Sequence, residues 1–450
     1  MIEPNGRPDV SEPVLPPHSH DVLSSRRTPT IFKTTTVVIL CTAATGFALG
    51  ATAIVTARLL GPSGRGVVVL IVTLVSLTAL VSTLGTNVAA RVHLVSPHDP
   101  IPLGSYLGIS YVLTLLQFFF CALVSALLLP VVKVPLSLAS ILLVAVYGAS
   151  SLLALLLRDA LYGLGYSATA AFLQGAGSVA GFLFVLALAL LGVRTVLPYV
   201  AALTLGSALW AVSNLVALGR VSGGLGPGMD RAHWLRLVKN GAPGLALSLS
   251  ENASFRFDRY LTGVFLPPSQ VGIYSVAATF SEFLWVAPLS LGQVLFHRVA
   301  SRGISSGTIA RLRRYSFLLT LAIGSVLFAL VPLGIRIGFG PSFRHAIGPS
   351  RVLILGALAI ASYYVDNLVL AATGRIASAG GVALNGFLSI TIGDLVLIPL
   401  RGIEGAAWAS TLGYTLMALL SKRHLDRELR TIQVGGSASG SEASRRSLDD

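Results

Sequence analysis

The stretch from residue 35 to residue 90 reads TTVVILCTAATGFALGATAIVTA (35–57), RLLGPSGRG (58–66) and VVVLIVTLVSLTALVSTLGTNVAA (67–90). The outer two segments are apolar, and each reaches the roughly 20 residues that an α-helix needs to cross a hydrocarbon core of about 30 Å. The middle segment holds glycine, proline and serine, which favour a tight turn. This stretch therefore predicts two consecutive transmembrane helices joined by a short turn.

Apolar runs of similar length continue along the rest of the chain. The twelve runs cover approximately residues 35–57, 67–90, 106–129, 136–157, 169–191, 196–218, 244–266, 271–296, 316–333, 351–372, 376–400 and 404–421. The composition agrees, because 54% of the residues are hydrophobic and 11% are charged, whereas about a quarter of an ordinary soluble domain is charged. The expected fold class is an all-α integral membrane protein with about twelve transmembrane helices.

The formal net charge of +14 would suggest a nucleic-acid partner in a soluble protein. Here the Lys and Arg residues lie between the apolar runs rather than on one basic face, so no nucleic-acid partner is expected. If the N-terminus is cytoplasmic, the cytoplasmic segments hold 22 Lys and Arg residues and the outer loops hold 8. Cytoplasmic loops carry the excess of these residues, which predicts that both termini are cytoplasmic.

An internal repeat divides the chain into two halves. Residues 59–68 match residues 265–274 at a constant offset of 206. The identical pairs are Leu60 and Leu266, Pro62 and Pro268, Ser63 and Ser269, and Gly66 and Gly272. Six helices in each half keep the halves parallel, related by an axis along the membrane normal. The repeat predicts two six-helix bundles around a central cavity.

These patterns predict five regions along the chain. They are a disordered cytoplasmic tail at 1–33, the first bundle at 34–219, a cytoplasmic linker at 220–243, the second bundle at 244–421, and a tail at 422–450 that is basic and then disordered. Within the linker, Trp234, Leu235 and Val238 share one helical face. The linker is therefore expected to contain an amphipathic helix in the membrane interface.

Four segments are similar to a known family: ARLLGPSGRG (57–66), RFDRY (256–260), VGIYSV (271–276) and GIEGAA (402–407). In their order and spacing they resemble the Wzx-type polysaccharide flippases. This family belongs to the multidrug/oligosaccharidyl-lipid/polysaccharide exporter superfamily, which also holds the MATE exporters and the lipid II flippases. The resemblance implies a MATE-like fold with two bundles around a central cavity.

The resemblance also implies a function. Such a flippase moves a polyprenyl-pyrophosphate-linked oligosaccharide from the cytoplasmic to the outer leaflet by alternating access, for the biosynthesis of cell-surface polysaccharides such as O-antigen or exopolysaccharide. The implied location is the bacterial cytoplasmic membrane. The implied partners are the lipid-linked oligosaccharide, membrane lipids, and other polysaccharide assembly proteins such as a polymerase and glycosyltransferases.

Two other functions compete with the flippase. A MATE-like ion-coupled antiporter of small molecules or drugs is the alternative, but the first apolar run contains no acidic residue. A membrane glycosyltransferase or polymerase would need catalytic residues on a large outer loop, and the outer loops are short. The chain has no Walker motif, and its eight histidines lie outside the central apolar runs. We therefore expect no catalytic residue, no cofactor and no metal site.

The seventh apolar run carries the candidate substrate-binding residues Glu251, Arg256, Asp258 and Arg259. Glu251 and Asp258 are seven residues apart and share a helical face, from which Arg259 is rotated by about 80° and Arg256 by about 140°. Arginine presents paired donors that match phosphate oxygens, so Arg256 or Arg259 could bind the pyrophosphate in the cavity. The alternative is that Asp258 and the arginines neutralise one another, and this is the favoured interpretation of Arg259.

Three further acidic residues lie within apolar runs: Glu282, Asp366 and Asp394. Charged groups in a membrane are costly, at about 2.5–3.5 kcal/mol each on insertion scales, and they often serve transport. These acids are candidates for proton or sodium coupling, and hydrogen bonding between helices is the alternative for each. The positions of Arg58 and Arg65 next to a turn are explained by topology or by side chains that extend to the interface.

Overall fold

The computed structural model describes residues 31–96, 100–134, 137–302 and 306–446. Twelve α-helices make up almost all of this part of the chain, and it contains no β-strand. The helices are α2 (Ile31–Ser82), α3 (Thr86–His93), α4 (Leu103–Val131), α5 (Leu138–Gly163), α6 (Ser167–Leu190), α7 (Val196–Ser222), α8 (Arg231–Phe265), α9 (Pro268–Arg302), α10 (Ser306–Gly334), α11 (Ile347–Ala372), α12 (Ile376–Arg401) and α13 (Ile403–Arg446).

The first helix, α2, contains both of the first two predicted spans. Its backbone leaves the helical conformation at Gly61, where φ is 65° and ψ is −175°. Glycine adopts a positive φ without steric cost, and Pro62 suits the first turn of the second leg because its missing N–H would be unpaired there. The predicted turn between the first two spans is therefore this bend in α2.

Eight helices are long and apolar enough to cross a membrane. The first of them is 47 residues long, which is enough for two crossings at about 20 residues each. Helices α8, α9 and α13 have 35, 35 and 44 residues and are long enough as well, but they carry more polar and charged side chains. With two crossings from α2, the long helices agree with the twelve predicted spans, and the protein is a multi-pass membrane protein.

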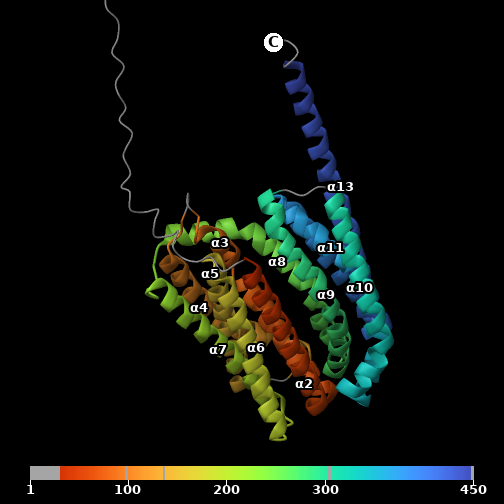
Figure 1. Cartoon of the computed structure of the whole chain (residues 1–450). Helices are drawn as coiled ribbons and strands as arrows, with labels where there is room; N and C mark the ends of the chain where they lie inside the picture. The colour runs from red at the N-terminus through yellow and green to blue at the C-terminus, as the bar shows by residue number, and fades with distance from the viewer. Residues whose placement is uncertain (1–30, 97–99, 135–136, 303–305, 447–450) are drawn as a thin grey trace, which may run out of the picture.

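The helices form two groups that lie side by side (Figure 1). In the first half, α2 packs on α6, α4 on α5, and α7 on both α5 and α6. In the second half, α11 packs on α9, α10 and α13, while α12 packs on α8 and α13. The main contact between the halves joins α2 to α9, and α2 also contacts α8. Each half has its own hydrophobic core, so the fold class predicted from the apolar runs is confirmed.

The repeated motifs of the two halves contact each other. A Cβ placed on Gly66 would lie 1.7 Å from the carbonyl oxygen of Pro268, and a Cβ placed on Gly272 would lie 2.0 Å from the carbonyl oxygen of Pro62. Both pairs are related by the offset of 206 seen in the sequence. The reciprocal contact is what a two-fold relation between the halves produces. It also explains why both motifs carry glycine at this position, since any side chain would separate the helices.

The linker and the C-terminal tail differ from what the sequence predicts. The amphipathic helix of the linker continues past Pro243 as the first part of α8. Its Trp234 packs against the core of the first half and donates from Nε1 to the carbonyl of Ser105 at 2.9 Å. Helix α13 runs on to Arg446, through residues 435–446 that were expected to be disordered, because extending an existing helix needs no new nucleus. Residues 1–30 of the predicted N-terminal tail and 447–450 lie outside the described residues.

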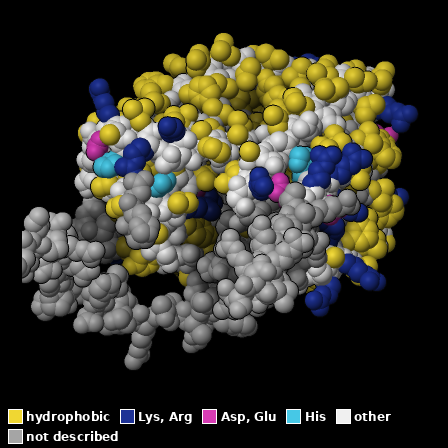
Figure 2. Space-filling model, turned by 90° about the horizontal axis from the view of Figure 1, so that it is seen from above, with side chains coloured by type: hydrophobic (Ala, Val, Ile, Leu, Met, Phe, Trp, Pro, Cys, Tyr) yellow, Lys and Arg dark blue, Asp and Glu magenta, His cyan; other side chains and the backbone are white. Residues whose placement is uncertain are grey.

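The face of the molecule from which α13 projects is basic. Figure 2 looks at this face and shows Lys and Arg side chains in two groups, while acidic side chains are few. An excess of Lys and Arg is typical of the cytoplasmic end of membrane helices. This distribution fits the orientation expected from the loop charges.

A cationic cavity between the two halves

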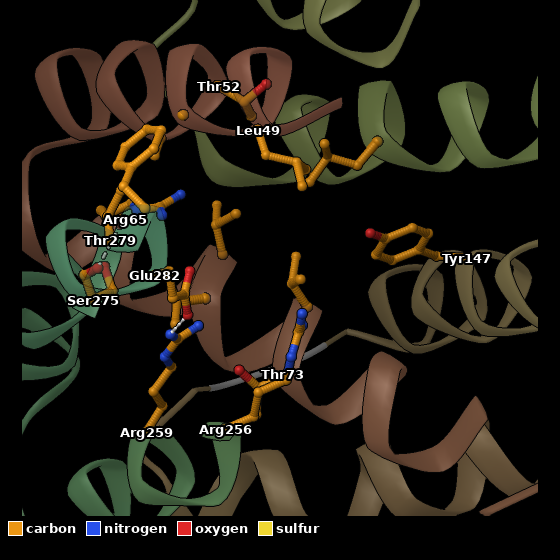
Figure 3. A pocket seen from close by; sticks show the side chains of 18 residues that line it. Leu49, Thr52, Arg65, Thr73, Tyr147, Arg256, Arg259, Ser275, Thr279 and Glu282 are labelled. Carbon is orange, nitrogen blue, oxygen red and sulfur yellow. Dashed lines mark hydrogen bonds and ion pairs between the residues drawn. The ribbon is translucent and has the colours of Figure 1, made fainter. Parts of the chain in front are cut away.

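A cavity of about 290 Å³ lies between the two halves. Its walls come from both legs of α2, from α5 and α7 in the first half, and from α8 and α9 in the second half. Figure 3 shows the labelled polar side chains of this wall gathered around an open space. The charged lining residues are Arg65, Arg256, Arg259 and Glu282. Three arginines and one glutamate give the wall a formal net charge of +2, so the cavity is electrostatically suited to an anion.

Arg256 lies on the wall of this cavity, on α8. Its Nη1 atom is 3.4 Å from the hydroxyl oxygen of Ser76 on α2, so the side chain reaches across the boundary between the halves. None of the ion pairs found among the described residues involves Arg256. Its guanidinium therefore keeps donors that an anionic ligand could use.

Arg259 is paired within the second half. Its guanidinium donates to the carboxylate of Glu282 on α9, and the two form an ion pair at the edge of the cavity (Figure 3). The sequence favours charge neutralisation with Asp258 for Arg259, and it makes Glu282 a candidate for ion coupling. The structure shows that the two residues contact each other, so both side chains belong to one pair on the cavity wall.

Arg65 is a cavity residue that the sequence analysis assigned to a helix end. It lies four residues after the bend at Gly61, and its Nη1 donates to the hydroxyl of Thr56 at 3.0 Å. Its Nε atom is buried and has no hydrogen-bond partner among the described residues. Val68, Val69 and Val72 line the same cavity at spacings of three, four and seven from Arg65, which is one helical face. In the sequence, this spacing indicates that Arg65 shares a helical face with the three valines.

Glu251 and Asp258, also predicted to bind substrate, are not among the residues that line this cavity. Glu251 accepts hydrogen bonds from the hydroxyl of Tyr363 at 2.6 Å and from Nδ2 of Asn367 at 3.0 Å, both on α11. Asp258 is buried and accepts from the hydroxyl of Tyr274 on α9 at 2.6 Å. The two acids share one face of α8, as expected, but this face packs into the second half, whereas the face with Arg256 borders the cavity.

Asp394 on α12 is a buried carboxyl group that no described residue pairs with. Its side chain is fully buried, and neither carboxylate oxygen has a hydrogen bond among the described residues. It lies close enough to Asp258 for the two carboxyl groups to interact electrostatically. Burying an unpaired carboxylate is costly, so this position needs either a proton or a cation.

Asp366 on α11 is buried too, but it is paired. Its Oδ1 accepts from Nε of Arg313 on α10 at 2.8 Å, and the two side chains form an ion pair. The contact joins two neighbouring helices of the second half. Of the three acids predicted for ion coupling, Asp366 and Glu282 thus have arginine partners and Asp394 has none among the described residues.

Comparison with known proteins identifies relatives of this chain. The sequence model of a family described as polysaccharide biosynthesis protein matches residues 31–298. A search of curated protein sequences finds no match. The fold resembles the lipid II flippase MurJ in an inward closed conformation, with a TM-score of 0.70, 14% identity, and coverage of 86% of this chain and 87% of that one.

Two solved structures of MATE transporters are also similar. One is the inward-facing conformation of a multidrug resistance MATE family transporter of the MOP superfamily, with a TM-score of 0.68, 13% identity, and coverage of 86% of this chain and 95% of the other. The second is the MATE transporter VcmN from Vibrio cholerae in its bent form, with a TM-score of 0.59, 14% identity, and coverage of 89% and 98%. At these identities the likeness concerns the fold, and the expected MATE-like fold is confirmed.

Proposed function

Because the chain belongs to the polysaccharide biosynthesis protein family, we propose that it is a flippase for a polyprenyl-pyrophosphate-linked oligosaccharide. It moves this lipid from the cytoplasmic to the outer leaflet of a bacterial cytoplasmic membrane, for the synthesis of a cell-surface polysaccharide. Both termini are cytoplasmic in this proposal. Its proposed functional partners are other proteins that act on the same glycan, namely a polymerase and glycosyltransferases.

The cationic cavity between the halves carries this proposal. A pyrophosphate diester bears two negative charges, and the lining of the cavity has a formal charge of +2. Arginine donors match phosphate oxygens in pairs. Arg65 comes from the first half and Arg256 from the second, so an anion between them contacts both halves. A ligand held in this way can respond to a change in the relative position of the halves, as alternating access requires.

The conformation supports the same mechanism. The halves meet at the motif glycines Gly66 and Gly272, which follow the first and seventh spans closely, on the side that the charge count puts outside. Nearby, the guanidinium of Arg58 on α2 donates to the carbonyls of Ile337 and Gly338, beyond the end of α10. These contacts close the outer end of the interface, so the conformation is one that would receive the substrate from the cytoplasmic leaflet.

Asp394 is the proposed ion-coupling residue. Its burial without a hydrogen-bond partner among the described residues supports the role, because binding a proton or a sodium ion there would remove the cost of the unpaired carboxylate. Asp258, with which Asp394 interacts electrostatically, accepts hydrogen bonds from the hydroxyls of Tyr274 and Ser410. A change of charge at Asp394 would therefore alter the electrostatic interaction with Asp258 on α8, the helix that also carries Arg256.

A MATE-like antiporter of small molecules is the second candidate, and the similarity to two MATE structures favours it. The positive charge of the cavity limits such a substrate to neutral or anionic molecules. Reconstitution separates the two functions. Liposomes containing the purified protein should transfer a fluorescent N-acetylglucosaminyl-pyrophosphoryl-polyprenol between leaflets faster than protein-free liposomes. No acceleration, together with ion-driven uptake of a water-soluble compound, would favour the antiporter.

A further inference from the structure

A second cavity, of about 180 Å³, lies between α2, α4 and α8. Seven hydrophobic side chains make up most of its wall: Leu74, Leu77 and Val81 on α2, Phe120, Val124 and Leu128 on α4, and Phe257 on α8. Val81 and Phe120 are each 38% exposed, so the cavity lies at the outer surface of the helix bundle rather than in its core. We refer to it as the apolar groove.

The few polar groups on the wall of the apolar groove are bonded within the protein. The hydroxyl of Thr78 donates to the carbonyl of Leu74 at 2.9 Å, in the same helix. The hydroxyl of Tyr260 donates to the carbonyl of Leu128 at 3.4 Å, which links α8 to α4. The ring of Tyr260 stacks on that of Phe257, with ring centroids 5.9 Å apart. A ligand in the groove therefore meets hydrocarbon and aromatic surface, and a hydrocarbon chain leaves no polar group of the wall unpaired.

The apolar groove and the cationic cavity are lined by neighbouring residues of the same two helices. On α2, Val72 and Thr73 line the cavity, and Leu74 and Leu77 line the groove. On α8, Arg256 faces the cavity and the next residue, Phe257, lines the groove. Consecutive helical residues are about 1.5 Å apart along the axis and about 100° apart around it. The groove and the cavity therefore lie at similar depth on neighbouring faces of α2 and α8.

We propose that the apolar groove holds the hydrocarbon chain of the lipid carrier while its pyrophosphate binds at Arg256. This inference rests on the proposed flippase function and names the place of the second part of the same substrate. A lipid-linked sugar joins a long hydrocarbon chain to an anionic head. The protein offers a matching site for each part: a cationic cavity for the anionic head and an apolar groove for the hydrocarbon chain. The groove keeps the chain in contact with apolar surface while the head crosses the membrane between the halves.

The first test compares two ligands on the full chain in phosphatidylcholine nanodiscs: inorganic pyrophosphate and farnesyl pyrophosphate. Val81→Trp fills the groove, and Val179→Trp on α6 is the matched control because Val179 is similarly exposed, at 37%. Val81→Trp should weaken the binding of farnesyl pyrophosphate roughly tenfold and leave that of pyrophosphate unchanged. Val179→Trp should change neither. Leu77→Trp replaces Val81→Trp if the latter does not fold.

The second test locates the chain directly. A farnesyl pyrophosphate with a benzophenone at the far end of its chain should, on illumination, label the peptides that contain Val81, Phe120 or Val124. Labelling confined to other helices would overturn the proposal. Equal labelling of the same peptides by a phosphatidylglycerol with the same photophore would overturn it as well, because the groove would then hold bulk membrane lipid.

The two proposals can fail separately. If the unsubstituted protein does not bind inorganic pyrophosphate, the proposed anion site fails, and the groove proposal fails with it. If pyrophosphate binds but Val81→Trp leaves the affinity for farnesyl pyrophosphate unchanged, only the groove proposal fails. The proposed flippase function then stands on the cationic cavity alone.

Discussion

The Nη1 atom of Arg256 on α8 lies 3.4 Å from the hydroxyl oxygen of Ser76 on α2. This contact joins the two halves at the wall of the cationic cavity, which Arg256 lines. Because 3.4 Å is long for a hydrogen bond to a charged donor, a phosphate oxygen could replace the hydroxyl at little cost. In the proposed function, Arg256 therefore links substrate binding to the contact between the halves.

Replacing Arg256 should impair transport in a graded way. Arg256→Ala removes charge-assisted hydrogen bonds worth about 1.5–3 kcal/mol, so transfer of the polyprenyl pyrophosphate probe should fall at least about tenfold. Arg256→Lys keeps the charge but loses the paired donors, so transfer should fall less than in Arg256→Ala. Transfer is measured in liposomes at equal protein content. Arg344→Ala, at an exposed position after α10, is the control, and normal transfer by Arg256→Ala would refute the site.

Arg65→Gln tests the cavity residue that the sequence analysis missed. The amide can still donate to Thr56, but the positive charge is lost, so affinity for inorganic pyrophosphate should fall by roughly fivefold to tenfold. Thr56→Val removes the hydrogen bond of Arg65 and should have the smaller effect. Titration calorimetry of both variants measures the difference. Unchanged affinity in Arg65→Gln would show that the first half contributes no charge to the anion site.

A side chain at either motif glycine should open the outer end of the interface. Gly272→Ala places a Cβ 2.0 Å from the carbonyl of Pro62, whereas the Cβ of Gly381→Ala on α12 meets nothing within 4 Å. Such overpacking costs about 1–3 kcal/mol, so Gly272→Ala should unfold at a lower temperature than Gly381→Ala. It should also make a cysteine introduced at Ser63 more reactive to an impermeant thiol reagent added from outside. Equal melting temperatures would contradict the close contact.

Asp394→Asn tests ion coupling. Asparagine has nearly the shape of a protonated carboxyl group and cannot become charged, so the variant should fold at least as stably but lose the dependence of transport on a proton or sodium gradient. Asp366→Asn serves as the comparison. It breaks the ion pair with Arg313, so it should lower the melting temperature but keep the gradient dependence. The coupling role is wrong if Asp394→Asn transport still follows the gradient.

Reporter fusions test the orientation. A reporter after residue 430, in α13, should be cytoplasmic, and one at Gly340, between α10 and α11, should lie outside. The excess of Lys and Arg in the loops assigned to the cytoplasm is the physical reason. The same sidedness at both positions would show that the number of crossings between them is even and would overturn the twelve-span topology.

The sequence by itself determined the helices and their pairing into halves. Membrane spans are predictable because every backbone polar group must be bonded within its own helix in lipid, so an apolar run of sufficient length has one outcome. The bend at Gly61 and the equivalence of Gly66 and Gly272 follow from the same local information. The bend is recorded in adjacent residues, and the equivalence is recorded in two short motifs that match at a constant offset.

Only the tertiary structure decided which helical face borders the cavity. Along α8, Arg256 and Glu251 are both ionisable groups within one apolar run, and helix geometry shows only that they lie on different faces. Contact of α8 with α11 buries Glu251 against Tyr363, and contact with α2 brings Arg256 to the cavity. The bend at Gly61 likewise turns Arg65 inward instead of toward the interface. These choices depend on helices far apart in the sequence, and no local pattern records which of them will be neighbours.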